Sequence, residues 1–140
     1  MRALIIYSEH TRKMKAIVQA ISSAIRKGGN DVDEVRVGRG KSITSLYIYD
    51  LVYIGSPVLG FWGGRFPGEL ASYIKSCSGL EGKKTAAFVT PRIIGTTRTL
   101  KRIMKALEEK GSIVMAFRTI KSLSEARDFG NILSRIADSG

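Results

Sequence analysis

Hydroxyl and cationic side chains cluster directly after the first apolar run of the chain. Ser8 and Thr11 supply hydroxyls there, and Arg12 and Lys13 supply positive charge at the start of a helical pattern. The free N–H groups and the dipole of a helix N-terminus attract anions, so this combination predicts a phosphate site. A purely structural role is equally open, in which Ser8 or Thr11 only caps the helix. His10 lies in the same cluster without an evident acid–base partner, and we interpret it as a loop residue beside the site.

A second group of residues offers flat aromatic surface. Phe61, Trp62 and Phe66 stand among glycines in the segment 56–67, which is longer than the roughly 2–6 residues usual for a strand-to-helix connection. Exposed rings in a loop over a crevice suggest stacking on a flat ligand. Packing as a small local core, or against a second subunit, is the alternative. We favour stacking for Trp62 and local packing for Phe66.

Short strand-like runs separated by helical patterns must position these groups. Four runs are apolar almost throughout, which is typical of strands buried on both faces of a parallel sheet. These runs cover residues 3–7, 51–55, 85–89 and 113–117. A fifth run, at 32–37, mixes charged and apolar residues and indicates an edge strand.

Apolar residues repeat at helical spacing between these runs. The helical stretches cover residues 14–25, 70–77, 100–107 and the segment from Ser122 onward, where Glu125 completes a capping box. The last stretch carries apolar residues as far as Ile136. The connection at 38–49 looks irregular, with at most a short helix at 42–46.

The alternation of strands and helices predicts βαβ units and a parallel sheet. Five strands in 140 residues fit one doubly wound domain over residues 1–140, a three-layer α/β/α sandwich with strand order 2-1-3-4-5. Ligands of such sheets bind beyond the carboxyl ends of the strands, where the strand order reverses. The segments 8–13, 56–67 and 90–97 are expected to meet there.

The formal net charge of +11 favours anionic partners, with a merely solvated basic surface as the alternative. The excess concentrates at the predicted carboxyl edge, where we assign a single acid, Glu9. The basic residues assigned to this edge are Arg12, Lys13, Arg39, Lys41, Arg65, Arg92, Arg98 and Lys121.

The most specific motif is the strand-like segment 49–57, which ends in Gly55, Ser56 and Pro57 before a glycine-rich loop. Together with segments 5–8, 87–90 and 107–111, it makes the sequence resemble the flavodoxin-like family over nearly its whole length. That family binds FMN, so the resemblance implies an FMN-binding protein in electron transfer or in flavin-dependent, quinone-reductase-like oxidoreduction. The residues expected to contact or border FMN are Ser8, His10, Thr11, Arg12, Lys13, Ser56, Pro57, Val58, Leu59, Gly60, Phe61, Trp62, Thr90, Pro91, Arg92 and Gly95.

The first loop departs from the family pattern at two positions. Arg12 stands where a glycine is usual, and Met14 stands where the last threonine is usual. We predict that the charge of Arg12 or Lys13 compensates for the lost hydrogen bonds to phosphate. Glu9 would repel phosphate unless its side chain points away. The net charge of +11 also differs from the acidic character of electron-carrying flavodoxins.

The expected partners are FMN and either a redox protein or a small electron acceptor. The alternative is a flavin-free module whose basic face docks nucleic acid or an acidic protein, or one half of a two-component enzyme. A homodimer stays open.

Several other classes are excluded by composition. One cysteine, Cys77, and one histidine build neither a disulfide framework nor a zinc site, and Cys77 lies on a helical apolar stripe, which indicates a core residue. No apolar run approaches the ~20 residues of a membrane span, and the start of the chain shows no signal-peptide pattern. We therefore expect a soluble, cytoplasmic protein.

Overall fold

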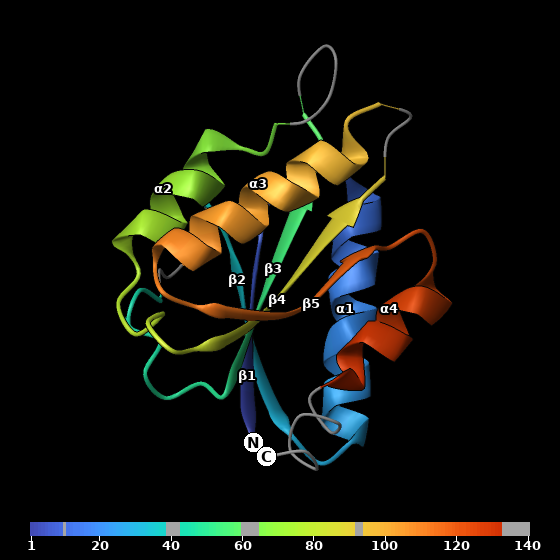
Figure 1. Ribbon diagram of the computed structural model, residues 1–140. Helices are drawn as coiled ribbons and strands as arrows, with labels where there is room; N and C mark the ends of the chain where they lie inside the picture. Colours follow the sequence, from blue (N-terminus) through green and yellow to red (C-terminus); the bar gives the residue numbers. More distant parts are fainter. Residues whose placement is uncertain (10, 39–42, 60–64, 92–93, 133–140) are drawn as a thin grey trace.

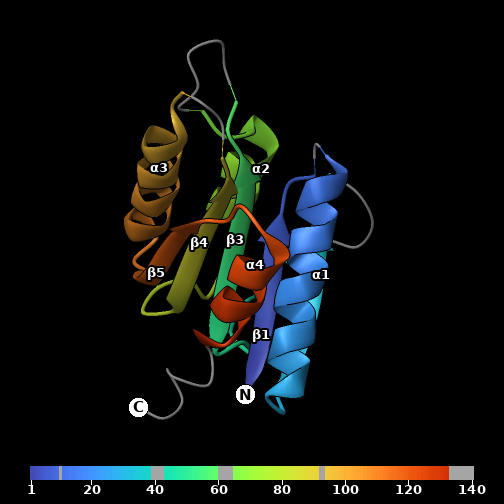
Figure 2. The ribbon, with the colours of Figure 1, turned by 90° about the vertical axis from the view of Figure 1, so that its right-hand side faces the viewer.

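The computed structural model of the protein describes residues 1–9, 11–38, 43–59, 65–91 and 94–132. Strands and helices alternate along these residues. In chain order they are β1 (Arg2–Tyr7), α1 (Arg12–Lys27), β2 (Asp31–Arg36), β3 (Leu51–Pro57), α2 (Gly68–Ser76), β4 (Lys84–Thr90), α3 (Thr96–Glu109), β5 (Ile113–Thr119) and α4 (Leu123–Gly130). Helices α1 and α4 cover one face of the sheet, and α2 and α3 cover the other (Figures 1 and 2).

Neighbouring strands of the sheet all run parallel, in the order β2-β1-β3-β4-β5. This finding confirms the predicted 2-1-3-4-5 topology. The strands therefore end at one side of the sheet, called the carboxyl edge below, which lies at the top of Figure 1. The chain leaves β1 toward one face and β3 toward the other, so the strand order reverses between their ends, the place where ligands of such sheets bind. Tyr7 and Gly55 are paired at this point.

Apolar side chains of the central strands alternate between two core layers. Ile5, Tyr53 and Phe88 pack toward α1 and α4, whereas Ile6 and Ile54 pack toward α2 and α3. The near-continuous apolar runs of β1, β3 and β4 are thus explained by burial on both faces.

Two glycines permit close packing on the α1/α4 side of the sheet. A Cβ atom on Gly55 would lie 2.2 Å from the ring of Phe88. A Cβ atom on Gly130 would lie 2.7 Å from the Cβ of Ala24, where α4 contacts α1. The hydroxyl of Tyr53 donates to the carbonyl of Phe129 at 3.0 Å, which ties α4 to the middle of the sheet.

The predicted cap at the start of α4 is confirmed. The Ser122 hydroxyl accepts from the N–H of Glu125 at 3.1 Å, and the Glu125 carboxylate accepts from the N–H of Lys121 at 2.7 Å. Residues 43–49 contain no helix, and the carbonyl and N–H of Ile43 are both bonded to the hydroxyl of Tyr73 instead. Ile136 lies outside the described residues.

The prediction that residues 113–117 are buried on both faces is wrong. Ile113, Met115 and Phe117 are 52%, 44% and 48% exposed. Strand β5 lies at an edge of the sheet, and the pairing with β4 shifts register between Thr85 and Ala86. An apolar run therefore stands here on a surface that the described residues leave uncovered.

Among the residues that the structure describes, no helix is long and apolar enough to cross a membrane.

Candidate functional site

A polar hollow of about 460 Å³ opens at the carboxyl edge, beside the ends of β1 and β2. Its volume falls within the range of about 300–1,000 Å³ that small-ligand sites occupy. The lining residues come from these strand ends and from the starts of α1 and α2: Ser8, Glu9, Thr11, Arg12, Arg36, Val37, Gly38 and Glu69. Three of the predicted phosphate residues, Ser8, Thr11 and Arg12, are brought together here.

The N-terminus of α1 supplies positive potential to this hollow. Thr11 is the N-cap of α1, and its hydroxyl accepts from the N–H of Met14 at 3.4 Å. The capping role predicted for Thr11 is therefore confirmed. The first turn carries no acid, and Arg12 and Lys13 are exposed. Unbonded N–H groups of a first helical turn together with two cations favour an anion.

Ser8 and Met14 have different surroundings. Ser8 is only 3% exposed but lines the hollow, and its N–H donates to the carbonyl of Gly55 at 3.1 Å. Met14 is 1% exposed and packs in the core between α1 and the sheet. The residue at the usual threonine position thus serves packing and does not contribute to the hollow.

Glu9, which also lines the hollow, forms an ion pair with Arg36. Its Oε2 lies 2.5 Å from Nη1 of Arg36, at the end of β2. Burial raises the pKa of the neighbouring Tyr7, with smaller increases from Glu34 and Glu9 and a decrease from Arg36. Tyr7 is therefore an uncharged phenol at neutral pH, and Arg36 offsets the charge of Glu9.

Glu69 is a second acid at this edge, so the assignment of a single acid there was wrong. It stands in the first turn of α2 and lines the hollow. A Cβ atom on Gly38 would lie 2.9 Å from Oε2 of Glu69, and Gly38 has a φ of +86°. The left-handed backbone favours glycine at position 38, whereas the flexible end of the Glu69 side chain could move away from a Cβ atom.

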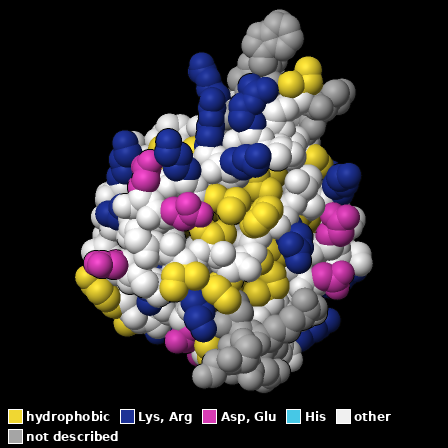
Figure 3. Space-filling model, in the orientation of Figure 1, with side chains coloured by type: hydrophobic (Ala, Val, Ile, Leu, Met, Phe, Trp, Pro, Cys, Tyr) yellow, Lys and Arg dark blue, Asp and Glu magenta, His cyan; other side chains and the backbone are white. Residues whose placement is uncertain are grey.

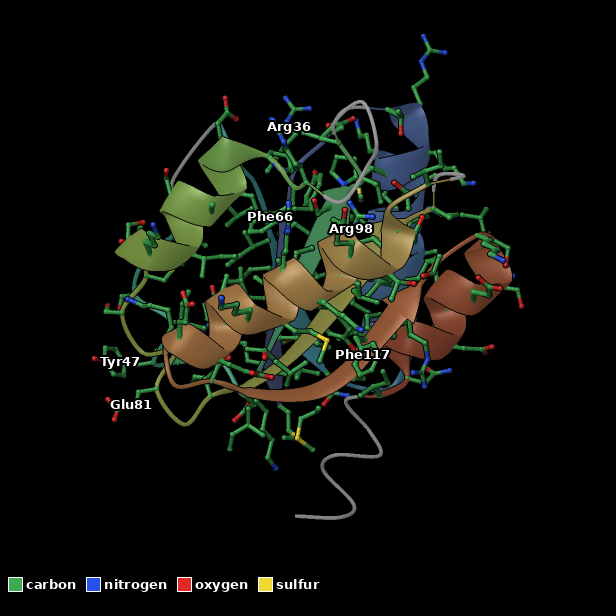
Figure 4. All side chains as sticks on the ribbon, turned by 45° about the horizontal axis from the view of Figure 1, so that its top comes forward. Arg36, Tyr47, Phe66, Glu81, Arg98 and Phe117 are labelled. Carbon is green, nitrogen blue, oxygen red and sulfur yellow. The ribbon has the colours of Figure 1, made fainter. Side chains whose placement is uncertain are left out.

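Arg36 and Glu69 were missed because they belong to elements other than the first loop. The position of Arg36 as the last charged residue of the edge strand was an available signal, since the carboxyl ends of neighbouring parallel strands meet. In Figure 4, Arg36 lies at the carboxyl edge near the start of α2.

The described part of the third loop is mostly buried. The Ser56 hydroxyl is buried and donates to the carbonyl of Pro57 at 2.7 Å. Val58 is also buried, and Leu59 is half-buried. The N–H groups of Leu59 and Arg65 each donate to the other's carbonyl, at 2.7 and 3.1 Å, which closes the base of the loop.

Phe66 is partly buried against the core layer under α2 and α3, so the prediction of local packing for Phe66 is confirmed. The candidate residues Gly60, Phe61 and Trp62 lie outside the described residues.

The fourth loop begins at Thr90, the last residue of β4, which is half-buried like Pro91. Gly95, with a φ of +85°, directly precedes α3. The Thr99 hydroxyl of α3 donates to the carbonyl of Arg65 at 3.3 Å, which joins the third loop to α3. The candidate residues His10 and Arg92 lie outside the described residues.

A second hollow of about 300 Å³ lies between β5 and α4, away from the crevice of the sheet. Two acids, Glu125 and Asp128, stand against one cation, Arg118, in its lining. This excess of acidic side chains does not suit an anion.

Cys77 is buried in the core, as predicted. The pKa of its thiol is raised to about 11, because burial raises it by more than the charge of Lys110 lowers it. Within the described residues, no group of histidine, cysteine, aspartate or glutamate could hold a metal ion.

The sequence matches no protein-family model and no curated protein. Its structure is similar to solved flavodoxins. The flavodoxin of Megasphaera elsdenii, solved in a two-electron reduced state, matches with a TM-score of 0.80 at 19% identity, over 95% of this chain and 98% of that one. Flavodoxin 2 of Bacillus cereus matches with a TM-score of 0.79 at 18% identity, over 96% and 99%.

A larger protein contains the same fold as one part. The flavodiiron protein of Giardia intestinalis matches with a TM-score of 0.77 at 16% identity, over 99% of this chain and 36% of that one. At such identities the similarity establishes the fold. The protein has the flavodoxin-like α/β fold.

Proposed function

We propose that the protein binds FMN and takes part in electron transfer or flavin-dependent oxidoreduction. The observation that carries this proposal is the hollow at the N-terminus of α1, in a flavodoxin-like fold. The first turn of α1 carries no acid, and the cations Arg12 and Arg36 line the hollow together with the acids Glu9 and Glu69. The flavodoxins and the flavodiiron protein described above support the same assignment.

The hollow fits a phosphate group. Ser8 and Thr11 offer hydroxyl oxygens, and the first turn of α1 offers N–H groups. Arg12 and Lys13 add positive charge, whereas the family usually has glycine at position 12 and threonine at position 14. A charge-assisted hydrogen bond contributes roughly 1.5–3 kcal/mol, against ~1 kcal/mol for a neutral one, so one cation offsets the missing threonine. The ion pair between Glu9 and Arg36 removes much of the repulsion from Glu9.

The flavin ring is placed by this proposal between the third and fourth loops, bordered by Pro57 to Trp62 and by Thr90 to Gly95. The buried hydroxyl of Ser56 is bonded to its own chain, so its role there is to hold the loop rather than to contact the ring. Bound FMN would supply the redox chemistry, and the chain would orient it, limit its exposure to water and hold its phosphate. A redox protein or a small acceptor would receive the electrons.

The test is a titration of the flavin-free protein with FMN and with riboflavin, which lacks the phosphate, followed by the visible spectrum and by fluorescence. We expect FMN to bind more tightly than riboflavin. The double variant Arg12→Ala plus Lys13→Ala should lose most of that preference, by roughly tenfold or more. Lys15→Ala is the matched control, because Lys15 is exposed on the same helix and does not line the hollow.

Two results would overturn the proposal in part or in whole. A protein whose spectrum does not change with FMN is not a flavoprotein, and the flavin-free alternative then holds. A double variant that keeps the full preference for FMN would show that the cations at the start of α1 are only solvated.

A further inference from the structure

Strand β5 exposes apolar side chains on its way along the edge of the sheet. Phe117 is 48% exposed, although it is paired with Ala87, a buried residue of the layer under α3. Phe117 therefore lies on the α3 side of the sheet. Val114, also on this side, is half-buried against the same layer. A half-exposed aromatic ring beside a packed core is a surface that another molecule can cover.

Helix α3 presents a row of cations next to this apolar strip. Arg98, Lys101, Arg102 and Lys105 are all exposed, and their spacing places them on one face of the helix over about 10 Å. None of the four has an ion pair with a described residue. The sequence contains no acid between Glu81 and Glu108, and the acids nearest to the row, Glu108 and Glu109, stand at the end of α3 beyond Lys105.

The two features form one surface, called the α3–β5 face below and made of the four cations with Val114 and Phe117. Figure 3 shows it directly: Lys and Arg side chains lie over α3, and hydrophobic surface lies beneath them over β5. In Figure 4, Arg98 marks the start of α3 near the carboxyl edge, and Phe117 lies below α3 on β5.

The α3–β5 face adjoins the third loop. The bond from Thr99 to the carbonyl of Arg65 joins α3 to the base of the third loop, and Arg65 is itself exposed. A molecule seated on α3 would therefore lie beside the loops that we expect to border the flavin.

We propose that the α3–β5 face is a docking surface for an acidic protein. An apolar centre with charges around it is typical of protein–protein interfaces, and opposite charge on the partner would pair with the unpaired cations and speed the encounter. The choice of an electron carrier as that protein rests on the proposed function, whereas docking itself does not need bound flavin.

Two other occupants fit the face less well. A second copy of the chain would meet it by two-fold symmetry, so the cations of one copy would face those of the other, which is unfavourable. Nucleic acid would pair its phosphates with the cations but would leave Phe117 and Val114 without a role, because backbone contacts are made by polar and charged groups.

The test is a titration of the ¹⁵N-labelled, flavin-free protein with an acidic [2Fe–2S] ferredoxin at low salt, followed by NMR. We expect shifted amide signals concentrated in α3 and β5. Each exposed ion pair changes a binding constant by up to about fivefold. Changing Arg98, Lys101, Arg102 and Lys105 to Gln should therefore weaken binding at least about tenfold, and Phe117→Ser should weaken it about threefold.

Matched controls lie on the opposite face of the sheet. The quadruple variant of Lys15, Arg26, Lys27 and Arg127 to Gln removes the same charge from exposed positions of α1 and α4. Leu123→Ser removes an apolar side chain that is 47% exposed on α4. Both variants should bind ferredoxin within about twofold of the wild-type protein.

Four outcomes would overturn the proposal: no binding of ferredoxin, signal changes located elsewhere, equal weakening by the control variants, or equally tight binding of a basic cytochrome c. Shifts in α3 and β5 caused by a 20-bp DNA duplex but not by ferredoxin would assign the face to nucleic acid. Concentration-dependent shifts of the protein alone in α3 and β5 would assign it to a second copy. Since no flavin is present, none of these results depends on whether FMN binds.

Discussion

The two edge strands of the sheet differ in what their exposed side chains contact. Along β2, charged side chains bond to the chain itself: the Asp33 carboxylate accepts from Arg2 at 3.1 Å and from the Tyr49 hydroxyl at 2.7 Å. Glu34, also on β2, accepts from the Ser22 hydroxyl at 2.9 Å. Along β5, in contrast, the described residues leave apolar side chains exposed.

The comparison teaches that hydrophobicity in a strand indicates a surface to be covered, but not the molecule that covers it. The alternation of β2 matches an edge that is complete within the chain. The apolar run of β5 would suit a central strand, and its exposure at an edge is a liability that proteins usually limit. The partner proposed for the α3–β5 face would cover Phe117 and so reduce this difference.

The most direct test of this comparison is to truncate a phenylalanine in the buried strand β4 and another in the edge strand β5. Phe88 is fully buried in β4, so Phe88→Ala should lower the free energy of unfolding by about 3–5 kcal/mol. Phe117→Ala in β5 should cost only about 1–1.5 kcal/mol, because about half of this side chain is already exposed. Urea denaturation followed by circular dichroism measures both values.

Equal losses for Phe88→Ala and Phe117→Ala would mean that the ring of Phe117 is covered within the isolated protein. The contrast between the edges would then disappear, and with it the main support for docking at β5.

The contact between Gly55 and Phe88 in the middle of the sheet is an example of tight packing, with which the exposed edge β5 can be compared. A Cβ atom on Gly55 would overlap the Phe88 ring, so Gly55→Ala should lower the free energy of unfolding by about 2–3 kcal/mol through overpacking. Gly68→Ala is the matched control. No atom lies within 4 Å of a Cβ on Gly68, which starts α2, so alanine there should be neutral or stabilising by up to about 1 kcal/mol. Thermal and urea unfolding of both variants tests the pair.

A stable Gly55→Ala protein would contradict the tight contact with Phe88. It would imply that the glycine of the family-like motif serves the ligand site rather than the core.

Much of the fold could be predicted from the sequence because its signals are local. Apolar runs, helical stripes and the glycines after them locate the elements, and the rules for parallel crossovers limit the strand order. The exposure of β5 could not be predicted, since it depends on how the other described elements pack around β5 rather than on the sequence of β5 itself.

The part of the candidate site that lies in one segment of the chain could be predicted from the sequence. Ser8, Thr11 and Arg12 are adjacent in the chain, and a helix start brings them together. Arg36 and Glu69 reach the same hollow only through pairing of β2 with β1 and packing of α2. Such contributions from distant elements need the tertiary structure.

The hydrogen bond between Tyr49 and Asp33 beside β2 predicts that the free energy of unfolding depends on pH in the alkaline range. The pKa of Tyr49 is raised from its ordinary value of 10.0 to about 12, chiefly by burial and then by the hydrogen bond to Asp33. The pKa of Tyr49 is higher in the folded protein than in the unfolded chain. The protonated tyrosine therefore contributes its full stabilisation below pH ~10, and this stabilisation is lost as the pH rises toward 12. Tyr49→Phe should lower the free energy of unfolding by about 1.5 kcal/mol at pH 7. It should also reduce the fall in the free energy of unfolding above pH 10, because phenylalanine does not titrate.

Tyr47→Phe controls for the substitution itself, since Tyr47 is 71% exposed. It should change the free energy of unfolding by less than about 0.5 kcal/mol at either pH. If Tyr49→Phe behaves like Tyr47→Phe, the hydrogen bond to Asp33 contributes nothing, and β2 is no better satisfied than β5.

The smallest effect is expected at the ion pair between Glu9 and Arg36, where the β2 edge meets the candidate site. Glu9→Gln should cost at most about 1 kcal/mol of stability, because both side chains are partly exposed. It should also free the charge of Arg36 and strengthen FMN binding by about two- to fivefold at low salt, an effect that screening removes near 1 M salt. Glu81→Gln, at an exposed position on the opposite edge, should change neither quantity. An unchanged FMN affinity in Glu9→Gln, with Glu81→Gln unchanged as well, would show that Arg36 neutralises Glu9 completely and that the edge contributes no charge to the site.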